Sequence, residues 1–210
     1  LIFFCFISDL KANSSNQGTL YSKKNISNYF AGIISSNDNA NKLTLKYFED
    51  LSQLKNHHDR FNREMVFALV QEQKISEAFL YLKKLKKKNL NFFNANLLLG
   101  IDGFLKKNYE DSSHYFTSII QNKKFSNFEK SIAQLLLSYI KVFEKPSYDD
   151  YKIVLNTIPN NYKNFVLINE AFINCYLDNQ DVDKRFLKLI NPNTLNFTRY
   201  NFFYVNFLIS

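Results

Sequence analysis

The chain has 210 residues, of which 46% are hydrophobic and 17% aromatic, so it is long enough to bury the core of a full domain. Only 4 Gly and 3 Pro favour long elements joined by short turns, and no stretch alternates apolar and polar residues, so we expect no strands. Lys and Arg number 27 against 19 Asp and Glu, a net charge of +8. This basic balance raises the question of an anionic partner.

Residues 1–12 begin with the apolar run LIFFCFI. Seven residues cannot span a bilayer, which takes about 20. We interpret residues 1–12 as a clipped signal peptide with cleavage after Ala12, followed by a polar linker over 13–24. This predicts an exported protein, periplasmic or membrane-associated if bacterial, with a cytoplasmic protein as the alternative.

Apolar residues at helical spacing predict ten helices between the linker and residue 190. The expected ranges are 25–36, 39–55, 59–73, 76–88, 93–105, 109–122, 127–144, 147–156, 162–177 and 182–190. We expect these helices to be capped by short polar side chains that accept a backbone N–H. The candidate caps are Asp38 or Asn39, Asp59, Ser76, and Ser126 or Asn127.

The same three-residue pattern recurs at a fixed period in the first six helices. A small or apolar residue in the first helix of a pair is followed by a small one in the second helix and, one turn further on, by a large apolar one. The three sets are Gly32, Thr44 and Phe48, then Val66, Ala78 and Leu82, then Gly100, Ser112 and Phe116. A small residue in each helix allows close approach, and the large residues then fill the space toward the next hairpin. We expect Phe48 and Phe116 to be interior.

A helix-turn-helix unit that repeats at this period, about 34 residues, resembles the tetratricopeptide repeat. The third unit carries the resemblance best, with Leu99, Gly100, Tyr109, Ser112 and Phe116. The resemblance implies an all-α fold, a right-handed α-solenoid of stacked hairpins over residues 25–195. The alternative is an irregular helical bundle in which the spacing is accidental.

This chain departs from the repeat pattern at two positions in each unit and at its fourth unit. Asn28, Asn62 and Asn96 replace the aromatic residue of the first helix, and Asn56, Leu90 and Lys124 replace the terminal proline. The fourth unit slips in register, because Ser147 comes one residue later after Ser112 than the period requires. Residues 196–210 look like the first helix of a further repeat with nothing to cover its apolar side. We therefore expect the sequence to be part of a longer solenoid, and residues 13–210 to aggregate or oligomerise through that helix.

In tetratricopeptide arrays the first helix of each hairpin lines a concave groove that binds partners. The resemblance implies that the groove of this chain would be apolar and aromatic, with two arginines, and suited to a peptide with apolar anchors and an acidic group. The residues implied are Ile26, Tyr29, Ile33, Arg60, Arg63, Phe67, Asn94, Leu97, Ile101 and Phe104. The alternative is that a flanking segment covers the groove.

Residues with catalytic or metal-binding chemistry do not form a recognisable motif. His57 and His58 are adjacent and His114 stands alone, so none has the i, i+4 spacing of a metal site. Cys175 lies between apolar residues and is expected to be a buried, inert thiol. We therefore predict a non-enzymatic protein with no catalytic residues, no cofactor, no metal and no small-molecule substrate.

Two functional hypotheses follow. The first is a scaffold that binds a protein or peptide partner. The alternative is a helical-repeat nucleic-acid-binding protein that uses its basic surface, although the inner positions are mostly apolar. Lysines 83, 84, 86, 87 and 88 are expected to form a solvated helix end, with contact to phosphate or an anionic membrane surface as the alternative.

Overall fold

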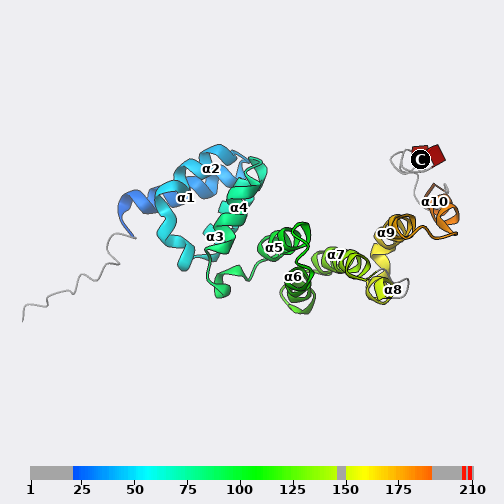
Figure 1. Cartoon of the computed structure of the whole chain (residues 1–210). Coiled ribbons are helices and arrows are strands. Elements are labelled where there is room, and N and C mark those ends of the chain that lie inside the picture. Colours follow the sequence, from blue (N-terminus) through cyan, green and yellow to red (C-terminus); the bar gives the residue numbers. More distant parts are fainter. Residues whose placement is uncertain (1–20, 146–149, 191–204, 207, 210) are drawn as a thin grey trace, which may run out of the picture. The chain divides into compact units, whose positions relative to one another are not determined.

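The computed structural model describes residues 21–145, 150–190, 205, 206, 208 and 209. The described chain is helical and contains no strand, which confirms the all-α prediction (Figure 1). It divides into two compact units, Leu1–Leu90 (unit 1) and Asn91–Ser210 (unit 2). The proposed signal peptide and most of the linker lie outside the described residues, as does most of 196–210. Val205, Asn206, Leu208 and Ile209 are helical.

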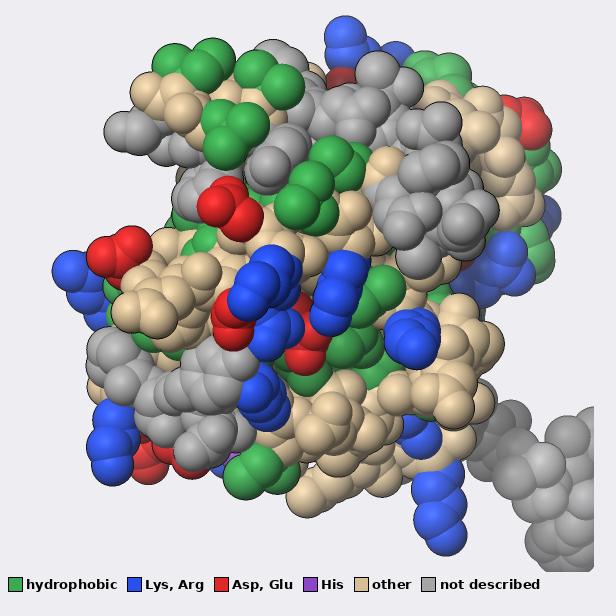
Figure 2. Space-filling view, turned by 90° about the vertical axis from the view of Figure 1, so that its right-hand side faces the viewer, with side chains coloured by type: hydrophobic (Ala, Val, Ile, Leu, Met, Phe, Trp, Pro, Cys, Tyr) green, Lys and Arg blue, Asp and Glu red, His purple; other side chains and the backbone are tan. Residues whose placement is uncertain are grey.

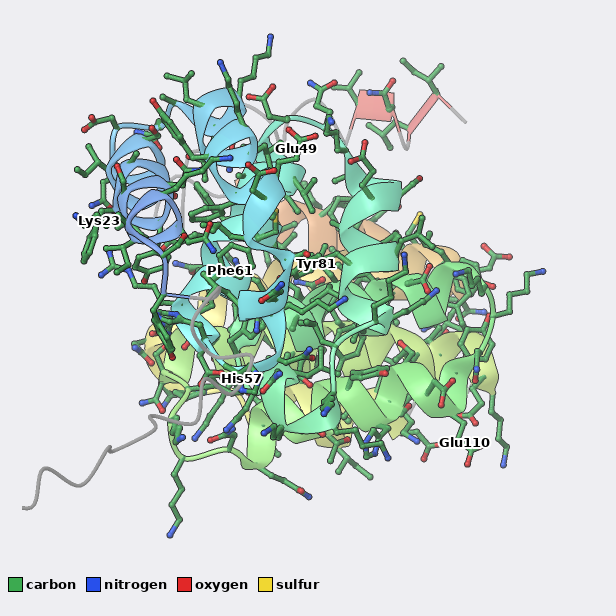
Figure 3. The ribbon with its side chains drawn as sticks, turned by 90° about the vertical axis from the view of Figure 1, so that its left-hand side faces the viewer. Lys23, Glu49, His57, Phe61, Tyr81 and Glu110 are labelled. Atoms are coloured by element: carbon green, nitrogen blue, oxygen red, sulfur yellow. The ribbon has the colours of Figure 1, made fainter. Side chains whose placement is uncertain are left out.

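Unit 1 is built from two α-helical hairpins joined by a 3₁₀ helix. In chain order its elements are α1 (Lys23–Asn37), α2 (Asn41–Phe48), η2 (Glu49–Asn56), α3 (Asp59–Gln71), α4 (Ile75–Lys83) and η3 (Lys87–Leu90). Helix α2 packs on α1 and on α3, and α4 packs on α3. In Figure 3 the side chains of Phe61 and Tyr81 point between these helices, whereas Lys23, Glu49 and His57 are exposed.

The expected helix over 39–55 changes from α to 3₁₀ at residue 49, with a kink at Leu51 (φ −101°, ψ 19°). The reason is the spacing of its apolar residues. Phe48, Leu51 and Leu54 follow one another every three residues and all are buried. A 3₁₀ helix has three residues per turn and keeps such residues on one face, whereas an α-helix would rotate them away from it.

Unit 2 continues with helical hairpins that pack on their neighbours in sequence. Its elements are α5 (Phe93–Leu105), α6 (Tyr109–Gln121), α7 (Asn127–Glu144), α8 (Asp150–Leu155), η4 (Asn160–Tyr162), α9 (Lys163–Tyr176) and α10 (Val182–Ile190). Helix α7 contacts α5, α6, α8 and α9, and α9 contacts α10. The predictions for 93–105, 127–144 and 182–190 are confirmed to the residue.

The turn inside each of the first three hairpins has the same geometry at the same place in the repeat. Asn39, Gln73 and Lys107 adopt positive φ of 58°, 60° and 60°. In each turn the residue after them donates its N–H to a carbonyl five residues back: Ala40 to Ser35, Lys74 to Leu69, and Asn108 to Gly103. This is the Schellman arrangement, which satisfies the last carbonyls of the first helix and reverses the chain.

Two hairpins, one in each unit, are held together by the same contact. A Cβ on Gly32 would overlap the ring of Phe48, and a Cβ on Gly100 would overlap the ring of Phe116. Phe48 and Phe116 are 0% and 1% exposed, which confirms that both are interior. Beside each ring a hydroxyl donates to the glycine carbonyl: Thr44 Oγ1 at 3.4 Å, and Ser112 Oγ at 2.6 Å. The residues that recur in the sequence therefore make the same packing contact and the same hydrogen bond in both hairpins.

Three of the four expected N-caps are wrong. Ala40, His58 and Lys74 occupy the cap positions of α2, α3 and α4. The Schellman turns place the caps of α2 and α4 directly after the positive-φ residue, so Asn39 itself and Ser76 cannot serve. Ser126 is confirmed as the cap of α7, with a full capping box to Glu129.

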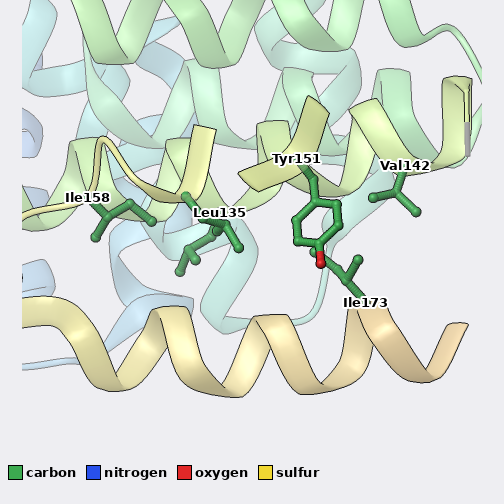
Figure 4. Packing of buried hydrophobic residues seen from close by; sticks show 6 residues of the cluster. Leu135, Val142, Tyr151, Ile158 and Ile173 are labelled. Carbon is green, nitrogen blue, oxygen red and sulfur yellow. The ribbon is translucent and has the colours of Figure 1, made fainter. Parts of the chain in front are cut away.

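Polar side chains make hydrogen bonds inside the apolar core between α7, α8 and α9. Tyr151 is fully buried among Leu135, Val142, Ile158 and Ile173 (Figure 4). Its hydroxyl accepts from Asn174 Nδ2 at 3.0 Å. That amide also donates to the Glu170 carbonyl at 2.6 Å. The polar atoms are thus satisfied inside an apolar cluster.

Candidate functional site

A pocket of about 180 Å³ opens where α1, the end of η2 and the start of α3 meet in unit 1. We call it the α1 pocket. Its lining is mostly apolar and aromatic, and consists of Tyr21, Asn25, Ile26, Tyr29, Phe30, Leu54 and His58. His58 caps α3 by accepting from the Phe61 N–H, and its ring lies 4.8 Å from the ring of Tyr29. The cap thus fixes one wall of the pocket.

Arg60 lies close to the Tyr29 wall of the α1 pocket. Burial raises the pKa of the Tyr29 hydroxyl, the Arg60 cation opposes this rise, and the Glu64 carboxylate adds to it. Arg60 Nε is 3.8 Å from Glu64 Oε1, and the Ser36 hydroxyl donates to the other Glu64 oxygen at 2.7 Å. The Arg60 side chain is 48% exposed. The guanidinium is therefore held loosely and remains accessible to a carboxylate from outside.

The structure separates the predicted groove residues of unit 1 into three groups. Tyr29 lines the α1 pocket and Arg60 lies beside it. Arg63 is exposed on α3, one turn beyond Arg60, and Phe67 is half-buried. Ile33 is only 7% exposed and belongs to the core cluster with Phe48, because this face of α1 rests on α2 and η2. It offers no surface to a partner.

In unit 2 the predicted groove residues face the next helix rather than open solvent. Leu97, Ile101 and Phe104 pack against a core cluster that includes Phe116 and residues of α7. Asn94 is half-buried. A second pocket of about 130 Å³, the α5–α7 pocket, lies among these helices. It is lined by Ile101, Phe104, Phe116, Leu136, Tyr139 and Phe143.

The sizes of the two pockets restrict what each could bind. Sites for drug-sized ligands and cofactors enclose about 300–1,000 Å³. Both pockets are well below that range. Each is large enough for one amino-acid side chain, which favours anchoring of a peptide over binding of a metabolite.

Sequence reasoning missed several pocket residues on segments that the repeat pattern does not assign to the groove. Leu54 and His58 come from η2 and the cap of α3, and Leu136, Tyr139 and Phe143 come from α7. Phe30 could have been found from the sequence. Ile26, Phe30 and Ile34 follow at intervals of four, and all three are exposed, at 44%, 58% and 60%. Such a stripe beyond the core face of a helix indicates a contact surface.

The described residues were also expected to lack a metal site and to contain an inert thiol. No group of three His, Cys, Asp or Glu within the described ranges is arranged to hold a metal ion. The thiol of Cys175 is free, and burial, then the nearby Asp178 carboxylate, raise its pKa, which disfavours the reactive thiolate. None of the helices in the described part is long and apolar enough to cross a bilayer. Comparisons with protein-family models, curated proteins and solved structures find no match.

Proposed function

We propose that the protein is a non-catalytic, tetratricopeptide-like scaffold that binds a protein or peptide partner through the first helices of its hairpins. The recurring Schellman turns at Asn39, Gln73 and Lys107 support a regular repeat, and the Gly–Phe contacts support a common packing within the hairpins. On this reading the hairpins stack as a right-handed solenoid. The apolar start of the sequence makes an exported protein our preferred setting.

Arg60 beside the α1 pocket carries this proposal. The pocket has room for one apolar side chain, and the accessible guanidinium of Arg60 is near enough to Tyr29 in its wall to oppose the rise that burial causes in the pKa of that hydroxyl. A partner segment that places a Leu or an aromatic residue in the pocket would bring a following Asp or Glu to Arg60, with Arg63 available for a second acidic residue. We therefore propose a ligand motif with one apolar anchor and one or two acidic residues close to it.

Peptide display against the purified 210-residue chain tests this motif. We expect the selected peptides to share an apolar anchor next to Asp or Glu. The Arg60→Glu and Arg63→Glu double variant should lose these peptides by at least about 100-fold, because reversed charge repels the carboxylate. Selection on that variant should instead enrich Lys or Arg beside the anchor.

A charge-matched control shows whether a loss of binding comes from these two arginines or from the change in net charge. Lys42→Glu with Lys46→Glu changes the net charge equally on α2, outside the α1 pocket lining. It should leave peptide affinity within about twofold at physiological salt, where the screening length is about 8 Å. If both double variants lose binding equally while circular dichroism shows folded protein, the α1 pocket is not the site.

A nucleic-acid-binding protein is the second candidate, because residues 21–90 contain 13 Lys and Arg against 7 Asp and Glu. Titration with mixed single-stranded RNA at increasing salt distinguishes the two. A steep negative dependence of the logarithm of affinity on the logarithm of salt concentration would favour this candidate.

A further inference from the structure

Two lysine-bearing segments of unit 1, far apart in sequence, are joined by buried hydrogen bonds. The carbonyl of Lys55, near the end of η2, accepts from Asn62 Nδ2 at 3.0 Å and from Asn89 Nδ2 at 2.9 Å. Asn62 and Asn89 are 0% and 5% exposed. Asn89 belongs to η3, so this carbonyl places the end of η2 against the lysine-rich turn that follows α4.

The same network is anchored in the core of the unit. The Tyr81 hydroxyl donates to Asn62 Oδ1 at 2.6 Å, and the Tyr81 ring packs against the cluster that contains Phe48 and Phe61. Tyr81 projects inward from α4 in Figure 3. The lysines around this network are therefore carried by a fixed backbone. We call them the lysine face, and its members are Lys55, Lys83, Lys84, Lys86, Lys87 and Lys88.

Five of the six lysines of the lysine face form no ion pair within the described residues. Within the described residues, no carboxylate lies within ion-pair distance of Lys55, Lys84 or lysines 86–88. Lys55 is half-buried, and the other four are exposed. The described part of unit 2 is more balanced, with 12 basic and 10 acidic residues. In the face shown in Figure 2, acidic side chains lie next to several of the basic ones. The lysine face is thus a local concentration of positive charge.

An exposed apolar residue accompanies the lysines. Leu80 is 58% exposed on α4, three and four residues before Lys83 and Lys84, so the three share one side of the helix. No aromatic side chain of residues 79–91 is exposed, because Phe79 and Tyr81 are half-buried and the Tyr81 ring is engaged in the core. Proteins that bind single-stranded nucleic acid stack bases on exposed aromatic rings. Lysines around an exposed leucine suit the headgroup region of a membrane, where the apolar group inserts and the cations meet lipid phosphates.

We infer that the lysine face is a docking surface for an anionic membrane, with Leu80 entering the headgroup layer and the lysines contacting lipid phosphates. This function is independent of peptide binding at the α1 pocket. Each lysine near an anionic leaflet contributes about fivefold in partition. Replacing three of them should therefore weaken membrane binding by roughly 100-fold.

Co-sedimentation of the 210-residue chain with vesicles tests the inference. The vesicles are pure phosphatidylcholine or a two-to-one mixture of phosphatidylcholine and phosphatidylglycerol. We expect binding to the mixed vesicles only, decreasing as salt is raised. Lys86→Gln, Lys87→Gln and Lys88→Gln together should reduce it by roughly 100-fold, and Leu80→Ser by severalfold.

Lys123→Gln, Lys124→Gln and Lys145→Gln together, on exposed residues outside the lysine face, remove the same charge and should leave vesicle binding unchanged. Inorganic phosphate at equal ionic strength should not displace the vesicles; displacement would indicate a site for small anions instead. Equal binding to neutral vesicles, or an unaffected triple variant, would overturn the inference. So would tighter, lysine-face-dependent binding of single-stranded RNA. The triple variant should keep the peptide affinity of the α1 pocket, so failure of either proposal is recognised separately.

Discussion

Replacing Gly100 with alanine has two opposite effects on the stability of the fold. Alanine is favoured over glycine inside a helix by about 1 kcal/mol. However, the new Cβ would overlap Cε1 of Phe116 and lie 2.7 Å from its Cζ, well inside the ordinary carbon–carbon contact of about 3.5–4.0 Å. Phe116 is 1% exposed and is packed with Ile119, Ala133 and Ile140, and it also lines the α5–α7 pocket, so its ring can shift only toward that pocket.

Overpacking of this kind costs about 1–3 kcal/mol. Because the ring can shift only toward the α5–α7 pocket, we take the middle of that range, so Gly100→Ala should destabilise the protein by about 1 kcal/mol net. Phe116→Leu removes the ring atoms that clash and should itself cost about 1 kcal/mol. The double variant should then be less destabilised than the sum of the single variants by about 1 kcal/mol or more.

Amide hydrogen exchange of α5 and α6 is the suitable assay, because it reports the local free energy of unfolding even if the two units unfold separately. Gly103→Ala is the control, since its Cβ would meet the Ser112 backbone 3.2 Å away and not the Phe116 ring. Gly32→Ala with Phe48→Leu should repeat the result in unit 1. A stabilising Gly100→Ala, or additive single effects, would refute the proposed contact.

Three further predictions concern the core, a helix cap and alkaline pH. Phe116→Ala should cost about 3–5 kcal/mol in urea unfolding, whereas Lys86→Ala on the surface should change stability little; equal losses would show that the assigned repeat register is wrong. Ser126→Ala removes the capping box of α7 and should cost about 1 kcal/mol, measured by thermal unfolding, with Ser126→Asp largely restoring it. Burial raises the pKa of Tyr139 to about 12. Because the folded state holds this proton more tightly than the unfolded chain, stability is complete below about pH 10 and falls as pH rises toward 12. Tyr139→Phe should reduce that fall in alkaline unfolding followed by circular dichroism.

The helices were predictable where the apolar spacing matches the α-helical period and a strong cap marks the start. Helix α7 shows this, because its apolar residues recur at helical spacing and Ser126 with Glu129 closes a capping box. The change to 3₁₀ at Glu49 was not predicted, because the whole segment 39–55 was expected to be one α-helix. His58 was overlooked as a cap because its ring nitrogen is a less common acceptor than the Asp59 carboxylate beside it.

The candidate site was only partly predictable. Transferring groove positions from the repeat pattern located Tyr29 and Arg60, which the structure brings together. It failed for Ile33, because η2 supplies a neighbour that covers that side of α1. The pocket walls formed by Leu54 and His58 depend on where η2 ends, and no pattern within α1 contains that information.

The Schellman turns have a consequence for how such a chain changes over generations. Each turn is closed by bonds between backbone atoms, and its central residue is Asn, Gln or Lys in the three hairpins. No side-chain atom takes part in these bonds, so several residue types fit the position, although its positive φ excludes proline and disfavours β-branched residues. Since the turns recur at a fixed interval, recombination between two of them adds or removes a whole number of hairpins and restores an intact turn at the junction. Such a protein can gain or lose hairpins by gene duplication or deletion, and no new turn sequence has to evolve at the junction.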